Sequence, residues 1–311
     1  MKQTMNLQEW ALLFSLAIIW GGSYFFVDVA LAQLPVISIV TLRVAGAALF
    51  LILLVYILGQ RMPATWHAWR GMMCIGLLNN AAPFCLIVWG QTHISGGLAS
   101  VLIAMTPVFS ILVLRGLGVE KRIGGGKLTG LLLGITGVAV IIGPDVIEGL
   151  KADLTAQLAI LLAAFSYACA GVYGKRLQGR GFSTLVITAG QVTASTVLLL
   201  PVVLWFDQPW LLSMPDTHVL LAIAGLALIC TALAYVIYFR ILSTAGPTNL
   251  LLVTFLAPIS AIALGAIFLG QSFASEHYIG MVLVGAGLLA IDGRVFAIFT
   301  RKSEVHQEVT K

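Results

Sequence analysis

Residues 76–110 read GLLNNAAPFCLIVWGQTHISGGLASVLIAMTPVFS and are almost wholly apolar. The stretch nevertheless contains two adjacent asparagines, Asn79 and Asn80, together with two prolines. Lipid offers no hydrogen-bond partner to an amide side chain or to a carbonyl that a proline leaves free, so such groups persist at membrane depth only where they face protein or a water-filled cavity. The stretch therefore predicts two membrane helices whose polar side lines an internal cavity.

The composition of the chain is that of an all-α integral membrane protein. Of 311 residues, 60% are hydrophobic and only 9% are charged, whereas a soluble domain has about 25% charged residues. A membrane-spanning helix needs about 20 apolar residues. On that basis we predict ten transmembrane helices, at residues 10–30, 35–57, 71–90, 96–114, 128–143, 155–174, 185–206, 218–239, 247–270 and 278–296.

The basic residues sort cleanly between the two sides of the membrane. With the N-terminus in the cytoplasm, Lys151 falls outside and Arg43 lies within a span, and all the other Lys and Arg residues fall on the cytoplasmic side. These are Lys2, Arg61, Arg70, Arg115, Lys121, Arg122, Lys127, Lys175, Arg176, Arg180, Arg240, Arg294, Arg301, Lys302 and Lys311. Because cytoplasmic loops are enriched in Lys and Arg, the sorting favours ten helices with both termini cytoplasmic. It also explains the net charge of +5 without a nucleic-acid partner.

The second half of the chain repeats the first. Asn80 corresponds to Thr231 and Phe84 to Tyr235, both at a spacing of 151 residues (231 − 80 and 235 − 84). The glycines of the fifth predicted helix recur in the tenth, as Gly130 and Gly280, Gly137 and Gly287, and Gly143 and Gly293. Five helices are an odd number, so the second copy enters the membrane from the opposite face, as in many secondary transporters. We predict inverted five-helix repeats at 8–143 and 155–296, followed by a polar cytoplasmic tail at 297–311.

Taken together, these motifs resemble the EamA family of the drug/metabolite transporter superfamily. The matching features are the sequence Trp20-Gly21-Gly22-Ser23-Tyr24-Phe25, Arg43 in the second helix, the run Asn79-Asn80-Ala81-Ala82-Pro83-Phe84, the prolines of the fourth and ninth helices, and Gly118-Val119-Glu120 before the fifth helix. One departure is Gln271, which stands where the family often has an acidic residue. The resemblance implies a multi-pass transporter of the bacterial inner (plasma) membrane, similar to exporters of amino acids, including aromatic ones, and other metabolites.

Helical spacing collects polar and aromatic residues on shared faces, for example Asn80, Phe84 and Gln91 in the third helix. A mostly apolar cavity with a few hydrogen-bonding groups is the usual makeup of a small-molecule site. Aromatic residues near helix ends are often interfacial anchors, but Trp20, Tyr24 and Tyr235 lie nearer mid-span, which favours a cavity. The residues predicted to bind substrate are Trp20, Ser23, Tyr24, Arg43, Asn79, Asn80, Phe84, Tyr167, Gln191, Thr231, Tyr235 and Tyr238.

Arg43 and the three prolines of these helices each allow more than one interpretation. Arg43 lies well inside the second helix, where its guanidinium either bonds carbonyls at a broken helix or receives a substrate carboxylate, for which its forked geometry is suited. Pro83, Pro107 and Pro258 each free a backbone carbonyl. They act either as static kinks or as hinges that open the cavity alternately to each side, and a mixture of the two is favoured.

The carboxylates are informative by their position. All twelve Asp and Glu residues lie in loops or near span ends, and Asp28 and Asp292 come closest to the interior. A proton-coupled exporter of cations usually needs an intramembrane carboxylate, so we predict a neutral or zwitterionic substrate. The sequence has no GxxxxGK[ST] phosphate loop and no spacing typical of a metal site, so it predicts no cofactor and no metal.

The sequence thus predicts a secondary transporter that exports amino acids or related metabolites by alternating access, with its site between helices 1, 3, 4, 6, 8 and 9. A multidrug or nucleotide-sugar carrier is the alternative within the same class. A channel-like membrane protein is the alternative from another class. An intramembrane enzyme is disfavoured because mid-span His, Asp and Glu are lacking. The predicted partners are a small-molecule substrate and the lipid bilayer, and a homodimer is compatible with the sequence although no motif decides it.

Overall fold

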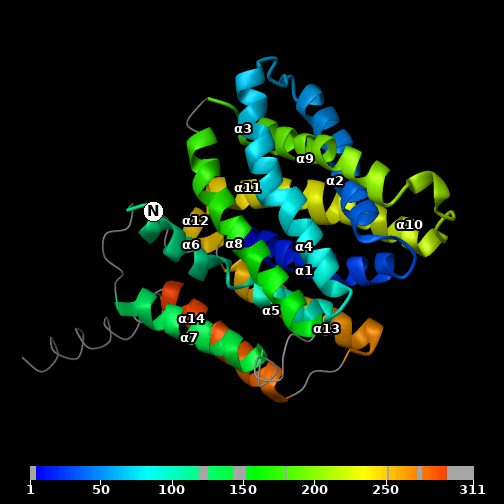
Figure 1. Ribbon diagram of the computed structural model, residues 1–311. Helices are drawn as coiled ribbons and strands as arrows, with labels where there is room; N and C mark the ends of the chain where they lie inside the picture. The colour runs from blue at the N-terminus through cyan, green and yellow to red at the C-terminus, as the bar shows by residue number, and fades with distance from the viewer. Residues whose placement is uncertain are drawn as a thin grey trace, which may run out of the picture.

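A computed structural model describes residues 5–118, 125–142, 152–178, 181–250, 252–271 and 275–292, and every regular element in these ranges is helical (Figure 1). The elements are α1 (Leu7–Leu31), α2 (Val36–Ile57), α3 (Trp66–Gly76), η1 (Leu77–Ala81), α4 (Ala82–Gln91), α5 (Gly96–Ile103), α6 (Thr106–Gly116), α7 (Gly125–Ile142), α8 (Ala152–Gln178), α9 (Thr184–Phe206), η3 (Pro209–Leu211), α10 (Thr217–Ala224), η4 (Gly225–Leu233), α11 (Ala234–Thr244), α12 (Pro247–Leu250), α13 (Val253–Leu269) and α14 (Ser275–Asp292).

Seven helices in the described ranges are long and apolar enough to cross a membrane, and they coincide with seven of the ten predicted spans. The predicted fifth, ninth and tenth spans correspond to shorter apolar helices, Leu128–Val140, Leu256–Leu269 and Ser275–Ala290. The all-helical class is therefore confirmed, while the count of ten spans and the orientation of the termini stay predictions. Several sequence predictions lie outside the described residues, namely Glu120, Gly143, Gly293, the end of the tenth span at 296 and the tail at 297–311.

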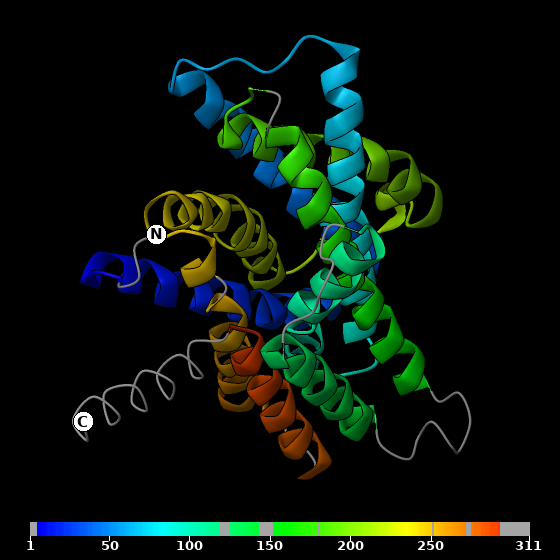
Figure 2. The ribbon, with the colours of Figure 1, turned by 90° about the vertical axis from the view of Figure 1, so that its left-hand side faces the viewer.

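Helices from the two halves of the chain pack against each other: α1 against α13, α2 against α9, and α7 against α14. The pairing of α7 with α14 is visible in two views (Figures 1 and 2). At this contact, a glycine of each helix lies against the backbone of the other helix. A Cβ added to Gly137 would lie 2.8 Å from the carbonyl oxygen of Gly280, and one added to Gly287 would lie 2.8 Å from that of Gly130. Small residues let membrane helices approach closely, and these glycines are the ones that the repeat pairs.

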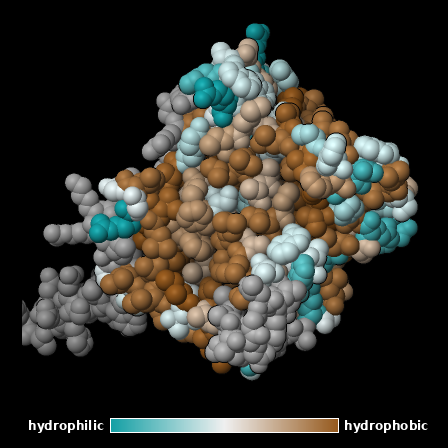
Figure 3. All heavy atoms as spheres, viewed as in Figure 1, coloured by the Kyte–Doolittle hydropathy of each residue, from teal (hydrophilic) through white to brown (hydrophobic). Residues whose placement is uncertain are grey.

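Many large apolar side chains lie exposed on the surface of the bundle. Leu49 and Trp205 are 73% and 77% exposed, and Figure 3 shows hydrophobic residues across the middle of one face with hydrophilic residues gathered toward its edges. A soluble monomer rarely exposes so large an apolar area. The outer surface is therefore suited to contact with lipid chains.

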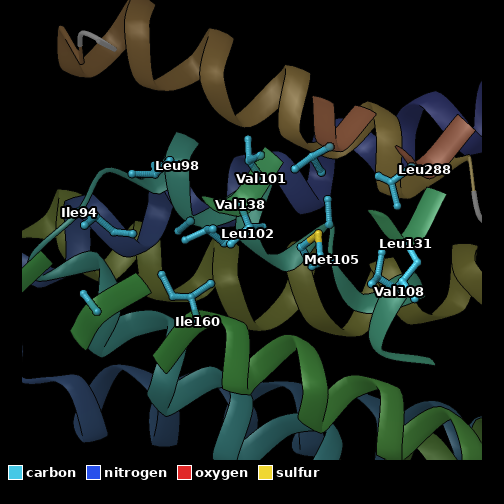
Figure 4. Close-up of a cluster of buried hydrophobic side chains, with 14 residues drawn as sticks. Ile94, Leu98, Val101, Leu102, Met105, Val108, Leu131, Val138, Ile160 and Leu288 are labelled. Carbon is cyan, nitrogen blue, oxygen red and sulfur yellow. The ribbon is translucent and has the colours of Figure 1, made fainter. Parts of the chain in front are cut away.

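A cluster of buried side chains joins α5, α6, α7, α8 and α14 (Figure 4). Leu102, Val108 and Ile160 are buried there, and Leu288 brings α14 to the same cluster. This packing links helices of the first half with helices of the second, so it holds the two halves in register around the polar residues described below.

The third and eighth predicted helices contain π-helical segments that the sequence does not predict. Segment η1 joins α3 to α4, and η4 joins α10 to α11. Under the spacing of 151 residues, the bounds of η1 correspond to Leu228 and Ala232 (77 + 151 and 81 + 151), which lie within η4. Position 83 is proline, whereas the corresponding position 234 is alanine, so η4 forms without a proline at this position. π-Helical turns occur frequently at functional sites, and these two carry the polar residues of the candidate site.

Candidate functional site

The π-helical segment η4 presents Thr231 to Arg43 of α2. The Arg43 Nε donates a hydrogen bond of 2.9 Å to Thr231 Oγ1. The Thr231 hydroxyl in turn donates to the carbonyl oxygen of Leu226, 2.8 Å away and five residues earlier. The wide turn of η4 therefore supplies an acceptor for Thr231, and Thr231 supplies one for the guanidinium. Arg43 and Thr231 come from different halves of the chain, so this contact connects the halves.

Segment η1 makes the matching contact with α9. Asn79 Nδ2 lies 3.2 Å from Gln191 Oε1 and 3.2 Å from the hydroxyl oxygen of Tyr235. The Tyr235 hydroxyl donates to Asn80 Oδ1 at 2.9 Å. Arg43 aligns loosely with Gln191 in the repeat, and Asn79, which contacts Gln191, directly precedes Asn80, the counterpart of Thr231, so the two contacts occupy similar but not identical positions in the two copies. The structure thus brings these predicted residues into two hydrogen-bonded groups, one of Arg43 and Thr231 and one of Asn79, Asn80, Gln191 and Tyr235.

Arg43 is buried and has few hydrogen-bond acceptors around it. Its side chain is 7% exposed, and its Cζ lies 3.8 Å from the centroid of the Phe84 ring, which places the cation over the negative face of the ring. A guanidinium has five N–H donors, and Nε is the one guanidinium nitrogen that donates a hydrogen bond among the described residues. The outer nitrogens therefore have donors available for an additional acceptor.

Asn80 has an unsatisfied donor in the same place. Its side chain is 0% exposed, and its Nδ2 has no hydrogen-bond partner in the described part of the chain. Phe84, on which Arg43 stacks, lies one helical turn after Asn80, so the two side chains share a face. Buried polar groups nearly always have partners. A group of unused donors beside a buried cation is therefore an arrangement that a ligand with acceptor oxygens completes.

The backbone of η1 is supported by hydroxyls from neighbouring helices. In a π-helical turn, the carbonyl of Leu78 pairs with the N–H five residues later, and that position is Pro83, which has no N–H. Ser166 of α8 replaces the missing bond by donating to the Leu78 carbonyl oxygen at 2.7 Å. Similarly, Ser195 of α9 donates to the carbonyl oxygen of Gly76 at 2.9 Å. These bonds hold η1 in its irregular conformation inside an apolar bundle.

We predict that Ser166→Ala destabilises the protein by about 1–3 kcal/mol, because it leaves the partly buried Leu78 carbonyl without a partner. The midpoint of thermal unfolding of purified protein in detergent measures this effect. Ser243→Ala is the matched control, since Ser243 is exposed and donates to the carbonyl of Arg240 within its own helix. Equal midpoints for the two variants would contradict the role assigned to Ser166.

The remaining residues predicted to bind substrate pack in other parts of the bundle interior. The rings of Trp20 and Tyr238 have centroids 5.7 Å apart. Ser23 is buried in α1, Tyr24 packs on the cluster that contains Leu102, and Tyr167 packs on the cluster that contains Phe84. Contact of these side chains with substrate stays a prediction.

The three predicted hinge prolines occupy different local environments. Pro83 lies in the first turn of α4, directly after η1. Pro107 lies in the first turn of α6, after a break between α5 and α6. There the missing N–H costs little, because a helix start has no partner for it. Pro258 alone lies inside a helix, α13. A hinge role for the three prolines stays a prediction.

The structure also shows a second polar group, which the sequence does not assemble. The sequence predicts that Gln91 shares a helix face with Asn80 and Phe84; in the structure its amide lies beside Asp28 near the end of α1. Gln271 reaches the same carboxylate from the end of α13. Asp28 is separated from Gln91 by 63 residues and from Gln271 by 243, so no local pattern signals this cluster.

The EamA-like transporter family model matches residues 9–143 and 154–291. Protein PecM of Dickeya dadantii (strain 3937) is 27% identical over 97% of this chain and 96% of its own length. A probable amino-acid metabolite efflux pump of Escherichia coli (strain K12) is 24% identical over 96% of this chain and 98% of its own. An uncharacterized inner membrane transporter of the same organism, YedA, is 24% identical over 91% of this chain and 90% of its own length.

One solved crystal structure is 16% identical and aligns with a TM-score of 0.65 over 91% of this chain and 97% of the solved chain. This likeness supports the fold alone. The chain therefore belongs to the EamA-like transporter family and is a multi-pass transporter of the bacterial inner membrane.

Proposed function

We propose that this transporter exports amino acids or related zwitterionic metabolites, and that Arg43 receives the substrate carboxylate. The observation that carries the proposal is the combination of a buried guanidinium with donors to spare and the unsatisfied Nδ2 of Asn80. A carboxylate accepts two parallel hydrogen bonds from the arginine fork. The E. coli relative that is named a probable amino-acid metabolite efflux pump supports this substrate class.

The proposed architecture is ten spans in two inverted five-helix repeats, with both termini in the cytoplasm. Two kinds of contact support it: the reciprocal glycine contacts between α7 and α14, and the paired hydrogen bonds of Arg43 with Thr231 and of Asn79 with Gln191. A site near the axis that relates two inverted repeats is reached from either side by rocking one repeat against the other.

The proposed transport step exchanges protein contacts for substrate contacts. Arg43–Thr231 and Tyr235–Asn80 join the two halves across the site. A substrate carboxylate that bonds Arg43, with Asn80 adding a further donor, competes with these cross-contacts and loosens the hold of one half on the other. The π-helical turns of η1 and η4 have irregular hydrogen bonding, so they are the places where such a rearrangement costs the least.

The proposal is tested by counterflow in proteoliposomes that contain the purified full-length chain. The vesicles are preloaded with an unlabelled amino acid, and uptake of the labelled compound is followed without any ion gradient. We expect saturable and stereospecific uptake of a few amino acids, with aromatic and branched ones tested first. Uptake of sugars, nucleotides or cationic drugs in place of amino acids would contradict the substrate class. Non-saturable flux would favour a channel-like protein.

A further inference from the structure

The second polar cluster lies at the ends of three helices and lines a cavity of about 500 Å³. Asp28 belongs to the last two turns of α1, Gln91 is the last residue of α4, and Gln271 follows the end of α13. This end of the bundle contains the α1–α2 and α9–α10 connections, whereas Arg43 and Asn80 lie within their helices. The cavity is therefore separate from the network around Arg43.

The Asp28 carboxylate is held by two neutral amides. Gln91 Nε2 donates to Asp28 Oδ1 at 2.6 Å, and Gln271 Nε2 donates to Asp28 Oδ2 at 2.8 Å. Gln91 Nε2 also lies 3.0 Å from the carbonyl oxygen of Tyr24. In the described part of the chain, Asp28 makes no ion pair with Lys, Arg or His. Each oxygen of the carboxylate thus accepts a hydrogen bond, but no positively charged side chain in the described part of the chain compensates its charge.

Both amide oxygens lack a partner. Gln91 is 8% exposed, and within the described residues neither Gln91 Oε1 nor Gln271 Oε1 has a hydrogen-bond partner. Because each amide gives its nitrogen to Asp28, its oxygen is left as an acceptor. Buried acceptors without donors are rare in native structures and call for an explanation. The cluster therefore combines one negative charge with two buried, unused neutral oxygens.

The packing around the carboxylate is close on one side. A Cβ added to Gly96 would lie 3.1 Å from Asp28 Oδ2 and 3.0 Å from Gln91 Nε2. The glycine at the start of α5 thus lets the backbone approach the cluster and hold it in place. On the other side, Asp28, Gln91 and Gln271 all line the cavity, and the two unpaired amide oxygens lie buried at its wall.

We propose that Asp28, Gln91 and Gln271 form a binding site for a compact monovalent cation at this end of the bundle. Carboxylate and carbonyl oxygens are the ligands that hard cations prefer, and the single negative charge of Asp28 balances a single positive charge. They equally suit a primary ammonium, whose three N–H donors match one carboxylate and two amide oxygens. The cation has two sources, a free sodium ion or the ammonium group of a transported zwitterion. The cation site itself does not depend on the proposed function. If the ligand is an ammonium group, the inference rests on the proposed function, because the cavity is then a second binding site for the substrate whose carboxylate Arg43 binds.

The test measures how cations change the thermal unfolding midpoint of the full-length protein in detergent. Methylammonium chloride, sodium chloride and tetramethylammonium chloride are added at equal concentrations to the wild type and to Asp28→Asn. The substitution keeps the size of the side chain, and the glutamine amides can turn over to bond the new amide group, so the fold is retained. Asp216→Asn is the matched control, because Asp216 also accepts a hydrogen bond from a glutamine, Gln33, but is exposed and does not line the cavity.

We expect a saturable rise of the midpoint with methylammonium or sodium, but not with tetramethylammonium, which is bulkier and has no N–H donor. The apparent affinity should be about tenfold or more weaker in Asp28→Asn, as for the loss of a charge-assisted hydrogen bond, and unchanged in Asp216→Asn. A response to methylammonium alone identifies an ammonium ligand, and a response to sodium alone identifies the metal ion.

Gln271→Met gives a second variant, which removes one amide oxygen and leaves the charge of Asp28 in place. We expect the apparent affinity to fall in this variant too. The proposal is overturned if the wild type shows no cation-specific shift, or if the shift persists unchanged in Asp28→Asn. Because the measurement needs no transport, a negative result here is distinguishable from a failure of amino-acid counterflow.

Discussion

Arg43→Gln is expected to lower the initial rate of amino-acid counterflow by about 100-fold or more. Removing one partner of a buried, hydrogen-bonded charge pair costs about 2–5 kcal/mol, and the substrate carboxylate would lose the fork that binds it. Glutamine keeps a polar side chain that still reaches Thr231, so the protein should insert and fold. The rate is measured per amount of reconstituted protein, in vesicles with equal protein orientation.

Two further variants sharpen this result. Arg43→Lys keeps the charge but loses the planar fork, so an intermediate rate would show how much the bidentate geometry contributes. Arg61→Gln removes an arginine that is exposed in the connection between α2 and α3, and it should leave the rate unchanged. Normal counterflow by Arg43→Gln would show that Arg43 serves only to connect α2 with η4.

The second large effect is expected at the crossing of α1 and α13. A Cβ added to Gly21 would lie 2.7 Å from the carbonyl oxygen of Ala257 and 2.8 Å from the backbone nitrogen of Ala261, and it would overlap the Ser260 hydroxyl. Two of these three atoms are backbone, so the helices must separate. Gly21→Ala should therefore destabilise the protein by about 1–3 kcal/mol, and it should weaken the bond of 2.8 Å from Ser260 Oγ to the Ala17 carbonyl oxygen.

The adjacent glycine provides the control for this prediction. A Cβ at Gly22 would meet only Leu264 Cδ1, at the ordinary contact distance of 3.6 Å. Gly22→Ala should therefore unfold at nearly the wild-type temperature, whereas Gly21→Ala should unfold well below it. Identical unfolding midpoints for the two variants in detergent would mean that α1 and α13 are not held as closely as described.

The sequence was sufficient to predict those parts of the site that depend on helical periodicity and on the internal repeat. The spacing of Asn80 and Phe84 predicts a shared face, and the repeat pairs them with Thr231 and Tyr235. In the structure, Phe84 lies under Arg43, Thr231 accepts from it, and Tyr235 bonds Asn80. Hydropathy located the long spans because lipid imposes the same requirement on every residue of a membrane helix.

What the sequence could not predict depends on contacts between distant segments. The π-helical turn at η1 is supported by Ser166 and Ser195 from two other helices, so the local sequence does not contain its cause. The sequence placed Asp28 near the end of a span, but it gave no sign that two glutamines orient its carboxylate. Those partners come from α4 and from the end of α13, and only the folded chain brings them together.

The central claim is that the polar network between the two halves is reached alternately from each side of the membrane. It is tested most directly by the accessibility of a cysteine at Asn79→Cys, in a chain whose four native cysteines are replaced by alanine. A membrane-impermeant maleimide is applied to right-side-out and to inside-out vesicles. Gln33→Cys and Arg61→Cys serve as controls that should each react from one side, outside and cytoplasmic respectively.

We predict that Asn79→Cys reacts from both sides, and that an amino acid active in counterflow protects it in both vesicle preparations. Reaction from one side only, with or without that amino acid, would contradict alternating access to this network.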